Sequence, residues 1–298
     1  MTKYIRYAAT PILVLFGIYF AMKGQYWMWV YEAIFTLIVI FGDLFLGDDR
    51  SRPEYAAPKL LNFFLYINLP LLFTILAISV WMVGSLPLPA WGASLMAARE
   101  ETTFIHLVGY VVVLGLMVAT AGTNVGHELT HRKRNRFDMF MGNWLLALTW
   151  DCSFAIEHVY GHHKYVATSI DPSTAKRGQN PYHFILRAIF LNQRNAWIIE
   201  NSRLVKKGLG SLSIQNRMLI GYARSGILTA AAYLLAGWTG VVVFLLISMG
   251  GKVVLEGVNY MEHYGLIREE GTPILPRHSW NTNRRVSSFF LFNLTRHS

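Results

Sequence analysis

The chain of 298 residues has little charge and almost no cysteine. Asp, Glu, Lys and Arg make up 15% of it, whereas soluble domains average about 25% charged residues. The lone Cys152 excludes an internal disulfide framework and any cysteine-rich zinc or iron–sulfur site. We expect no cleavable signal, because Met22–Lys23–Gly24 after the first apolar segment is not a small-residue cleavage site. This composition predicts an integral membrane protein.

Long apolar runs give the expected architecture. Six of them are long enough, or nearly so, to cross a bilayer as helices. They cover approximately residues 7–22, 26–46, 60–84, 103–126, 217–236 and 239–258. We therefore expect an all-α, polytopic membrane protein, a single domain over residues 1–298 in which six transmembrane helices are capped by a cytoplasmic helical region.

The placement of positive charge predicts the orientation. With the N-terminus in the cytoplasm, the external turns contain only Lys23 and Arg99 of the 27 Lys and Arg residues. An excess of positive charge on the cytoplasmic side is typical of membrane proteins, so the net charge of +10 needs no nucleic-acid partner. The polar region of about 127–216 should face the cytoplasm. Within it Met139–Trp150 is apolar but too short to span, and should be interfacial or buried.

Histidines gather in this cytoplasmic portion at spacings that suit a metal. His127 and His131 lie four residues apart, and on a helix they project from one face. His158 and His162 repeat this spacing, with His163 beside them. Further clusters surround His263, in 259–265, and His297, in 295–298. Imidazole without thiolate suits zinc, iron, copper or nickel.

The number of imidazoles favours two metal ions. At least seven candidates are too many for one tetrahedral ion, and a histidine-rich pair of irons that activates dioxygen explains them best. A zinc protease is the rival interpretation, because 127–131 matches the His-Glu-x-x-His pattern with Glu128 as general base. A single zinc would leave most of the clustered histidines without a role. His106 and His183 are expected to have no role, and His278 either supports the site or has none.

Three carboxylates adjoin the clustered histidines. Glu128, Glu157 and Glu262 either orient imidazole rings by accepting the second ring N–H, a common arrangement around metals, or one of them bridges the two ions. The sequence does not choose between these roles. Asp171 and Pro172 should shape a loop near the site.

Taken together, these motifs resemble the integral-membrane alkane hydroxylases, in the wider group of histidine-rich di-iron desaturases and hydroxylases. The matching stretches are Gly126–Arg132, Glu157–His163, Asn259–Gly265, Arg277–Asn281 and Leu294–Ser298. The resemblance implies two non-haem irons, with dioxygen as co-substrate, on the cytoplasmic side of the bacterial inner membrane. It implies as iron ligands His127, His131, His158, His162, His163, His263 and His297.

The same resemblance implies a reaction and its partners. The terminal C–H of an alkane would become a 1-alcohol, with electrons from rubredoxin or ferredoxin and an NAD(P)H-dependent reductase. The basic stretch Arg132–Arg136 either attracts an acidic donor or anchors the chain at the membrane. A xylene-type monooxygenase and a membrane fatty acyl desaturase remain alternatives. Aromatic residues that either line a substrate channel or face lipid are Trp27, Trp29, Phe41, Phe63 and Phe64.

The end of the sequence departs from the family pattern. The family's last motif continues to two adjacent histidines, whereas this sequence stops at Ser298. We therefore expect the chain to be incomplete at its C-terminus.

Overall fold

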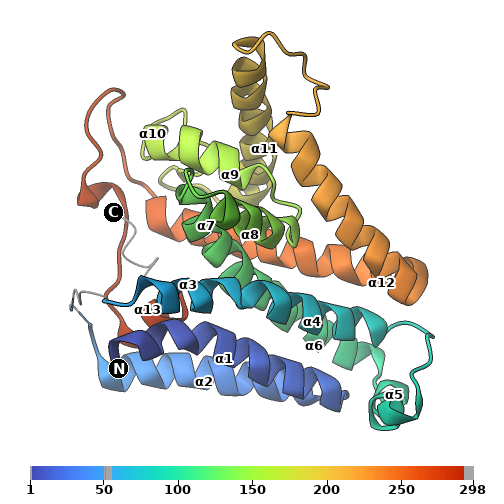
Figure 1. Cartoon of the computed structure of the whole chain (residues 1–298). Coiled ribbons are helices and arrows are strands. Elements are labelled where there is room, and N and C mark those ends of the chain that lie inside the picture. Colours follow the sequence, from blue (N-terminus) through green and yellow to red (C-terminus); the bar gives the residue numbers. More distant parts are fainter. Residues whose placement is uncertain (1, 50, 52–55, 292–298) are drawn as a thin grey trace. The chain divides into compact units, whose positions relative to one another are not determined.

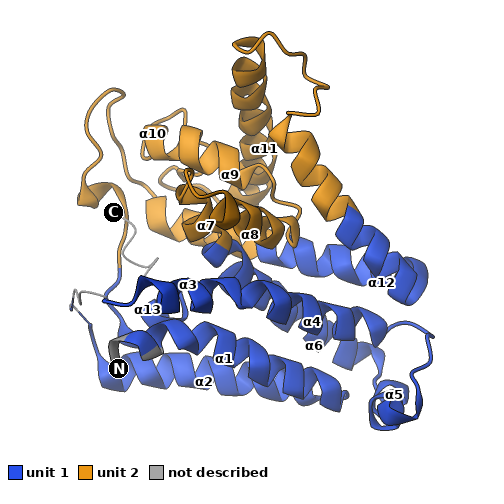
Figure 2. Ribbon diagram, in the orientation of Figure 1, with its two compact units in different colours: residues 1–125, 227–251, 282–296 blue, residues 126–226, 252–281, 297–298 orange. Residues whose placement is uncertain are grey.

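The computed structural model describes residues 2–49, 51 and 56–291 (Figure 1). These residues contain helices and no strand longer than the single antiparallel bridge pair of Asp48 and Arg284. The prediction of an all-α protein is confirmed for this part of the chain. The chain divides into two compact units (Figure 2). Unit 1 comprises residues 1–125, 227–251 and 282–296, and unit 2 comprises residues 126–226, 252–281 and 297–298. A single domain over 1–298 stays a prediction.

Unit 1 contains the N-terminal helices and the middle of α12. α1 packs against α2 and α4 (Figure 1). The turn from α1 to α2 needs left-handed backbone at Gly24 (φ 71°) and Gln25 (φ 47°), a conformation that glycine adopts at little cost. The elements are α1 (Thr2–Lys23), α2 (Trp27–Leu46), α3 (Pro58–Tyr66), α4 (Asn68–Trp81), α5 (Ala93–Glu100), α6 (Phe104–Met117), the π-helical turn η2 (Val118–Thr123) and α13 (Arg285–Phe290).

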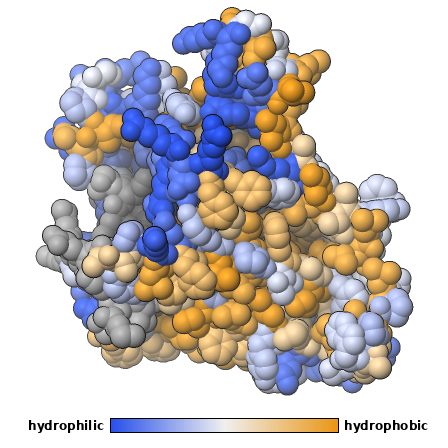
Figure 3. Space-filling view, viewed as in Figure 1, coloured by the Kyte–Doolittle hydropathy of each residue, from blue (hydrophilic) through white to orange (hydrophobic). Residues whose placement is uncertain are grey.

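Four helical stretches of the described residues are long and apolar enough to cross a membrane. They are Trp27–Leu46, Pro58–Trp81, Phe104–His131 and Arg217–His263. Hydrophobic residues cover most of the surface of unit 1 that Figure 3 shows. The last two predicted spans both fall within α12 (Arg217–His263), which is interrupted at Ala236 and Gly237. The number of spans, six, therefore remains a prediction, and the described residues contain four stretches that are long and apolar enough.

Unit 2 carries α7 (Asn124–His131) from Gly126 onward, α8 (Arg136–Ala147), α9 (Phe154–Glu157), the π-helical turn η3 (His158–His162), α10 (His163–Tyr165), α11 (Pro181–Val205) and both ends of α12. α8 begins where the Asn135 side chain accepts the N–H groups of Phe137 and Asp138, which satisfies donors that a helix start leaves open. The stretch predicted to be interfacial or buried forms most of α8, with Leu145 and Leu146 fully buried.

α7 and α8 approach each other closely at two glycines. A Cβ on Gly142 would lie 3.0 Å from Leu129 Cβ and 3.1 Å from the Gly126 carbonyl oxygen. A methyl group at this position would therefore push the two helices apart. This contact fixes α7, which carries the first histidine pair, against α8.

Candidate metal centre

Four imidazoles converge in unit 2. The Nε2 atoms of His127 and His131 are 3.0 Å apart, and His163 Nε2 lies 3.2 Å from His131 Nε2 and 3.0 Å from His158 Nε2. All four ring nitrogens lie within 4.8 Å of one another. We call these residues the four-histidine group. Phe154 packs parallel to the His158 ring at a centroid distance of 4.4 Å and so helps to hold its orientation.

The spacing of the four-histidine group fits a metal ion. Imidazole nitrogens bind zinc at about 2.0–2.1 Å. At that bond length, two neighbouring nitrogens on one ion are about 3.0 Å apart in octahedral and about 3.4 Å apart in tetrahedral geometry. The three observed spacings of 3.0–3.2 Å between neighbouring nitrogens fall in this range, so neighbouring rings of the group lie as they would around a shared metal ion.

The second histidine cluster differs from the helical arrangement that the sequence predicted. We expected His158 and His162 to share a helical face, as residues i and i+4 do in an α-helix. Residues 158–162 form instead the π-helical turn η3, whose hydrogen bonds connect residues i and i+5. The wider turn brings His163 Nε2 to 3.0 Å from His158 Nε2, while the His162 ring stacks against His158 at a centroid distance of 5.1 Å. The three rings therefore lie together as predicted, but on a π-helical turn.

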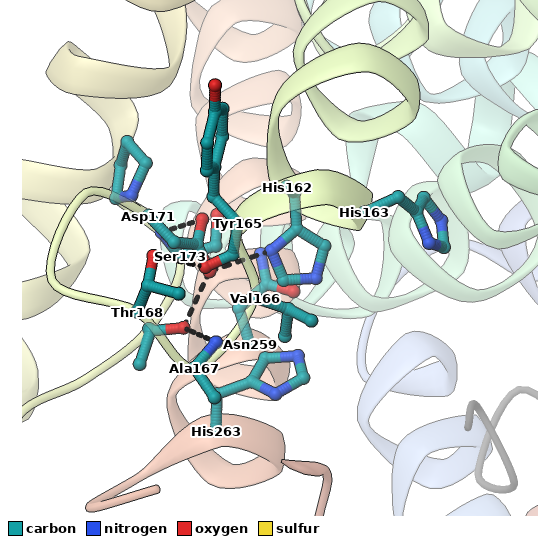
Figure 4. A network of polar contacts seen from close by, with 12 residues as sticks. His162, His163, Tyr165, Val166, Ala167, Thr168, Asp171, Ser173, Asn259 and His263 are labelled. Atoms are coloured by element: carbon teal, nitrogen blue, oxygen red, sulfur yellow. Dashed lines mark hydrogen bonds and ion pairs between the residues drawn. The ribbon is translucent and has the colours of Figure 1, made fainter. Parts of the chain in front are cut away.

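His162 belongs to a second, adjacent group. Its ring centroid lies 4.9 Å from that of His263 and 5.1 Å from that of His158. In Figure 4, His162 points toward Asp171 and His263, whereas His163 points away from them. The Nδ1 atom of His263 lies 3.2 Å from the backbone oxygen of His278, which leaves Nε2 as the atom able to bind a metal. Both rings are buried.

Asp171 holds the His162 ring. The Nδ1–H of His162 donates to Asp171 Oδ2 at 3.0 Å, and the same oxygen accepts the Thr174 hydroxyl at 2.6 Å (Figure 4). Burial lowers the pKa of His162, but the Asp171 carboxylate outweighs it and raises that pKa to about 9. The sequence placed Asp171 near the site without identifying this contact. The Asp-Pro-Ser-Thr turn was the available signal, because an Asp followed by Ser and Thr favours side-chain bonds to nearby groups.

The three predicted carboxylates lie in different surroundings. Glu128 is half-exposed and pairs with Arg132 at 2.8 Å. Glu157 is buried, and its Oε1 atom has no hydrogen-bond partner among the described residues. Burial raises the pKa of Glu157 to about 8, against the opposing effect of His162. Glu262 lies near enough to His162 to raise the pKa of that ring.

The remaining histidines are accounted for as follows. His297, an expected ligand, lies outside the described residues. The Nδ1 atom of His106 accepts the Thr103 N–H at the start of α6. His183 is exposed in the first turn of α11. His278 is buried, and its backbone oxygen, rather than its ring, contacts His263. The structure thus assembles six of the seven expected ligands in two adjacent groups of four and two.

Comparison with known proteins identifies the family. The model of the family described as fatty acid desaturase matches residues 102–298. Alkane 1-monooxygenase 1 of Pseudomonas aeruginosa is 33% identical over 299 residues, which cover 93% of this chain and 75% of that protein. The chain belongs to the fatty acid desaturase family. Its predicted resemblance to the membrane alkane hydroxylases is confirmed by these relatives.

Other relatives in the family act on two kinds of hydrocarbon, as their names state. Alkane 1-monooxygenase 2 of Alcanivorax borkumensis is 33% identical, with 92% of this chain and 71% of that protein covered. The xylene/toluene monooxygenase hydroxylase component XylM of Pseudomonas putida is 28% identical, with 93% of this chain and 71% of that protein covered. This member of the fatty acid desaturase family is therefore a membrane-bound oxidoreductase of the monooxygenase type with a histidine-rich metal site.

Proposed function

We propose that the chain hydroxylates the terminal methyl group of alkanes to give 1-alcohols. The observation that carries this proposal is the convergence of four imidazole nitrogens within 4.8 Å on a chain whose relatives are alkane 1-monooxygenases. Dioxygen supplies the inserted oxygen atom, and rubredoxin or ferredoxin, reduced through an NAD(P)H-dependent reductase, supplies the two electrons.

Two irons are the proposed cofactor. His127, His131, His158 and His163 would hold one, and His162, His263 and His297 would contribute to the second. Such irons, when bound, supply the activation of dioxygen. The described residues hold the rings in place: Asp171 and the His278 carbonyl bind the outer ring nitrogens of the second group, and burial of His127, His158, His162 and His263 keeps water away.

We assign the site to the cytoplasmic face of the bacterial inner membrane. The support is the distribution of Lys and Arg, which leaves only Lys23 and Arg99 in the external turns of the predicted topology. The hydrophobic substrate would enter from lipid, since an alkane partitions into the bilayer. An acidic electron donor would approach from the cytoplasm.

A second candidate substrate is a methyl group on an aromatic ring. The similarity to XylM, which also extends over 93% of this chain, favours it. An acyl desaturase would use the same metal site but would yield an alkene. Alkane hydroxylation, aromatic methyl hydroxylation and acyl desaturation are distinguished by analysing the products that this enzyme forms from octane, p-xylene and a saturated acyl lipid.

The test uses the full-length protein in lipid nanodiscs with rubredoxin, reductase and NADH. We expect about two irons per chain by metal analysis and 1-octanol from octane by gas chromatography. His131→Ala should abolish the product, whereas the exposed His183→Ala should retain it. One zinc and no iron per chain, or full activity of His131→Ala, would contradict the proposal.

A further inference from the structure

Two hollows in unit 1 share part of their lining. The larger, of about 450 Å³, lies along α1, α2 and α13, and its lining is apolar, including Ile12, Phe16, Phe20, Ile34, Phe35 and Ile38. This volume is within the range of about 300–1,000 Å³ found for ligand pockets. The smaller hollow shares Leu13, Tyr31, Phe35 and Phe290 with it. None of the five aromatic residues that the sequence suggested for a channel lines either hollow.

The smaller hollow contains a carboxyl group on a membrane-spanning helix. Glu32 of α2 lines it, and α2 is one of the four candidate spans. The Oε1 atom of Glu32 accepts the Thr36 hydroxyl at 3.1 Å, whereas Oε2 is buried with no hydrogen-bond partner among the described residues. An acidic group within a span is costly unless a partner satisfies it. A ligand is therefore expected at Oε2.

The other polar groups of this hollow also offer acceptors. The Thr10 hydroxyl donates to the Phe290 carbonyl at 3.0 Å, and the Thr120 hydroxyl donates to the Leu116 carbonyl at 2.9 Å. Each hydroxyl oxygen keeps a lone pair once its hydrogen is used. A ligand end that donates a hydrogen bond is complementary to this set, whereas a carboxylate has no hydrogen to donate to it.

We propose that these hollows form a binding site for a long-chain primary alcohol. The hydroxyl group donates to Glu32 Oε2 in the smaller hollow, and the hydrocarbon tail fills the larger, apolar one. The identification of this alcohol as the enzyme's own product rests on the proposed function, but the binding chemistry does not. The site disfavours carboxylates, which donate no hydrogen bond, and it holds alkanes less tightly because they leave Glu32 unsatisfied.

The experiment measures binding rather than turnover. Binding of 1-decanol, decane and decanoate to the chain in nanodiscs is followed by the shift of the thermal unfolding temperature, with empty nanodiscs used to correct for partition into lipid. We expect 1-decanol to give the largest shift and decanoate none. Glu32→Leu should weaken 1-decanol binding about tenfold, which corresponds to about 1.4 kcal/mol, and should not weaken decane binding, because leucine leaves no acceptor unsatisfied.

Two further variants separate a binding role from a structural one. Glu32→Gln keeps an acceptor oxygen and should retain most of the affinity, and Thr36→Val is the matched control on the same helix, since it removes only the bond to Oε1. Ala9→Phe, which fills the larger hollow, should weaken 1-decanol and decane alike. Equal affinity of wild type and Glu32→Leu for 1-decanol, the result expected if only water bound Oε2, would overturn the proposal.

A failure of the alcohol-binding proposal can be distinguished from a failure of the proposed function. If octane is not hydroxylated but 1-decanol binds through Glu32, the proposed function fails and the alcohol site stands. If octane is hydroxylated and Glu32→Leu binds 1-decanol like wild type, the alcohol site fails alone.

Discussion

The Nδ1 atom of His162 lies 3.0 Å from Oδ2 of Asp171, with both side chains buried. In the neutral, metal-binding form of the ring, a carboxylate in this position fixes the tautomer, with the proton on Nδ1 and the lone pair on Nε2. The second histidine group therefore depends on a residue that contributes no nitrogen to it.

Asp171→Asn tests this dependence. The amide keeps the size of the side chain but can present its NH₂ group to His162, which favours the wrong tautomer. Because partners of ligating histidines typically contribute 10–100-fold to metal affinity, we expect the affinity for the proposed iron at His162 to fall by about tenfold or more in a competition titration. Asp138→Asn, a buried aspartate of unit 2 that pairs with Arg132, is the control and should keep the iron content.

The division of the histidines into two groups predicts two classes of variants. His158 and His163 have facing Nε2 atoms 3.0 Å apart, whereas His162 lies beside His263. Mössbauer spectra of the chain loaded with ⁵⁷Fe should therefore lose the same iron signal in His158→Ala and His163→Ala, and the other signal in His162→Ala. Loss of one common signal in all three variants would show that the groups are not separate.

Acid stability should depend on Glu200. This carboxylate of α11 is buried and accepts bonds from Arg203 and Arg217. Burial acts to raise the pKa of Glu200, but these bonds outweigh it and lower the pKa from 4.5 to about 2. A lowered folded-state pKa stabilises the fold above the unfolded pKa, and this stability is lost as pH falls from about 5 toward 2.

At pH 7, Glu200→Gln should therefore have a free energy of unfolding about 2 kcal/mol below that of wild type. Its unfolding temperature should be lower accordingly. Its unfolding temperature should also change less than that of wild type between pH 5 and pH 3. Glu270→Gln, in an exposed loop, serves as the control. Parallel pH profiles for wild type and Glu200→Gln would contradict the role of this carboxylate.

A basic surface near the metal centre predicts how the electron donor binds. Lys133 Nζ lies 4.2 Å from the ring centre of Tyr160, and the Arg217 guanidinium carbon lies 5.5 Å from it. Tyr160 is itself exposed and lies between His158 and His162 in η3. Lys133→Glu should raise the KM for an acidic donor about tenfold without changing kcat, and higher salt should reduce the difference. Lys207→Glu, also exposed in unit 2, should have little effect.

The sequence predicted the features that depend on neighbouring residues along the chain. The apolar runs gave helices, and the glycines near 237 marked the interruption of α12. The His127–His131 pair forms as expected because α7 is a regular helix through both residues. The contact between Asp171 and His162 could not be predicted, because it depends on how the chain folds back between two residues nine positions apart. Glu32 was missed because its significance arises only from the hollow beside it.

The π-helical turn η3 makes the grouping of the histidines depend on backbone register. In a regular α-helix residues i and i+5 do not share a face, whereas here His163 Nε2 lies 3.0 Å from His158 Nε2. A one-residue deletion between His158 and His162 that restored a regular helix would place His162 and His163 at positions i+3 and i+4 from His158, on one face. Gain or loss of a single residue would therefore regroup the rings without removing any of them.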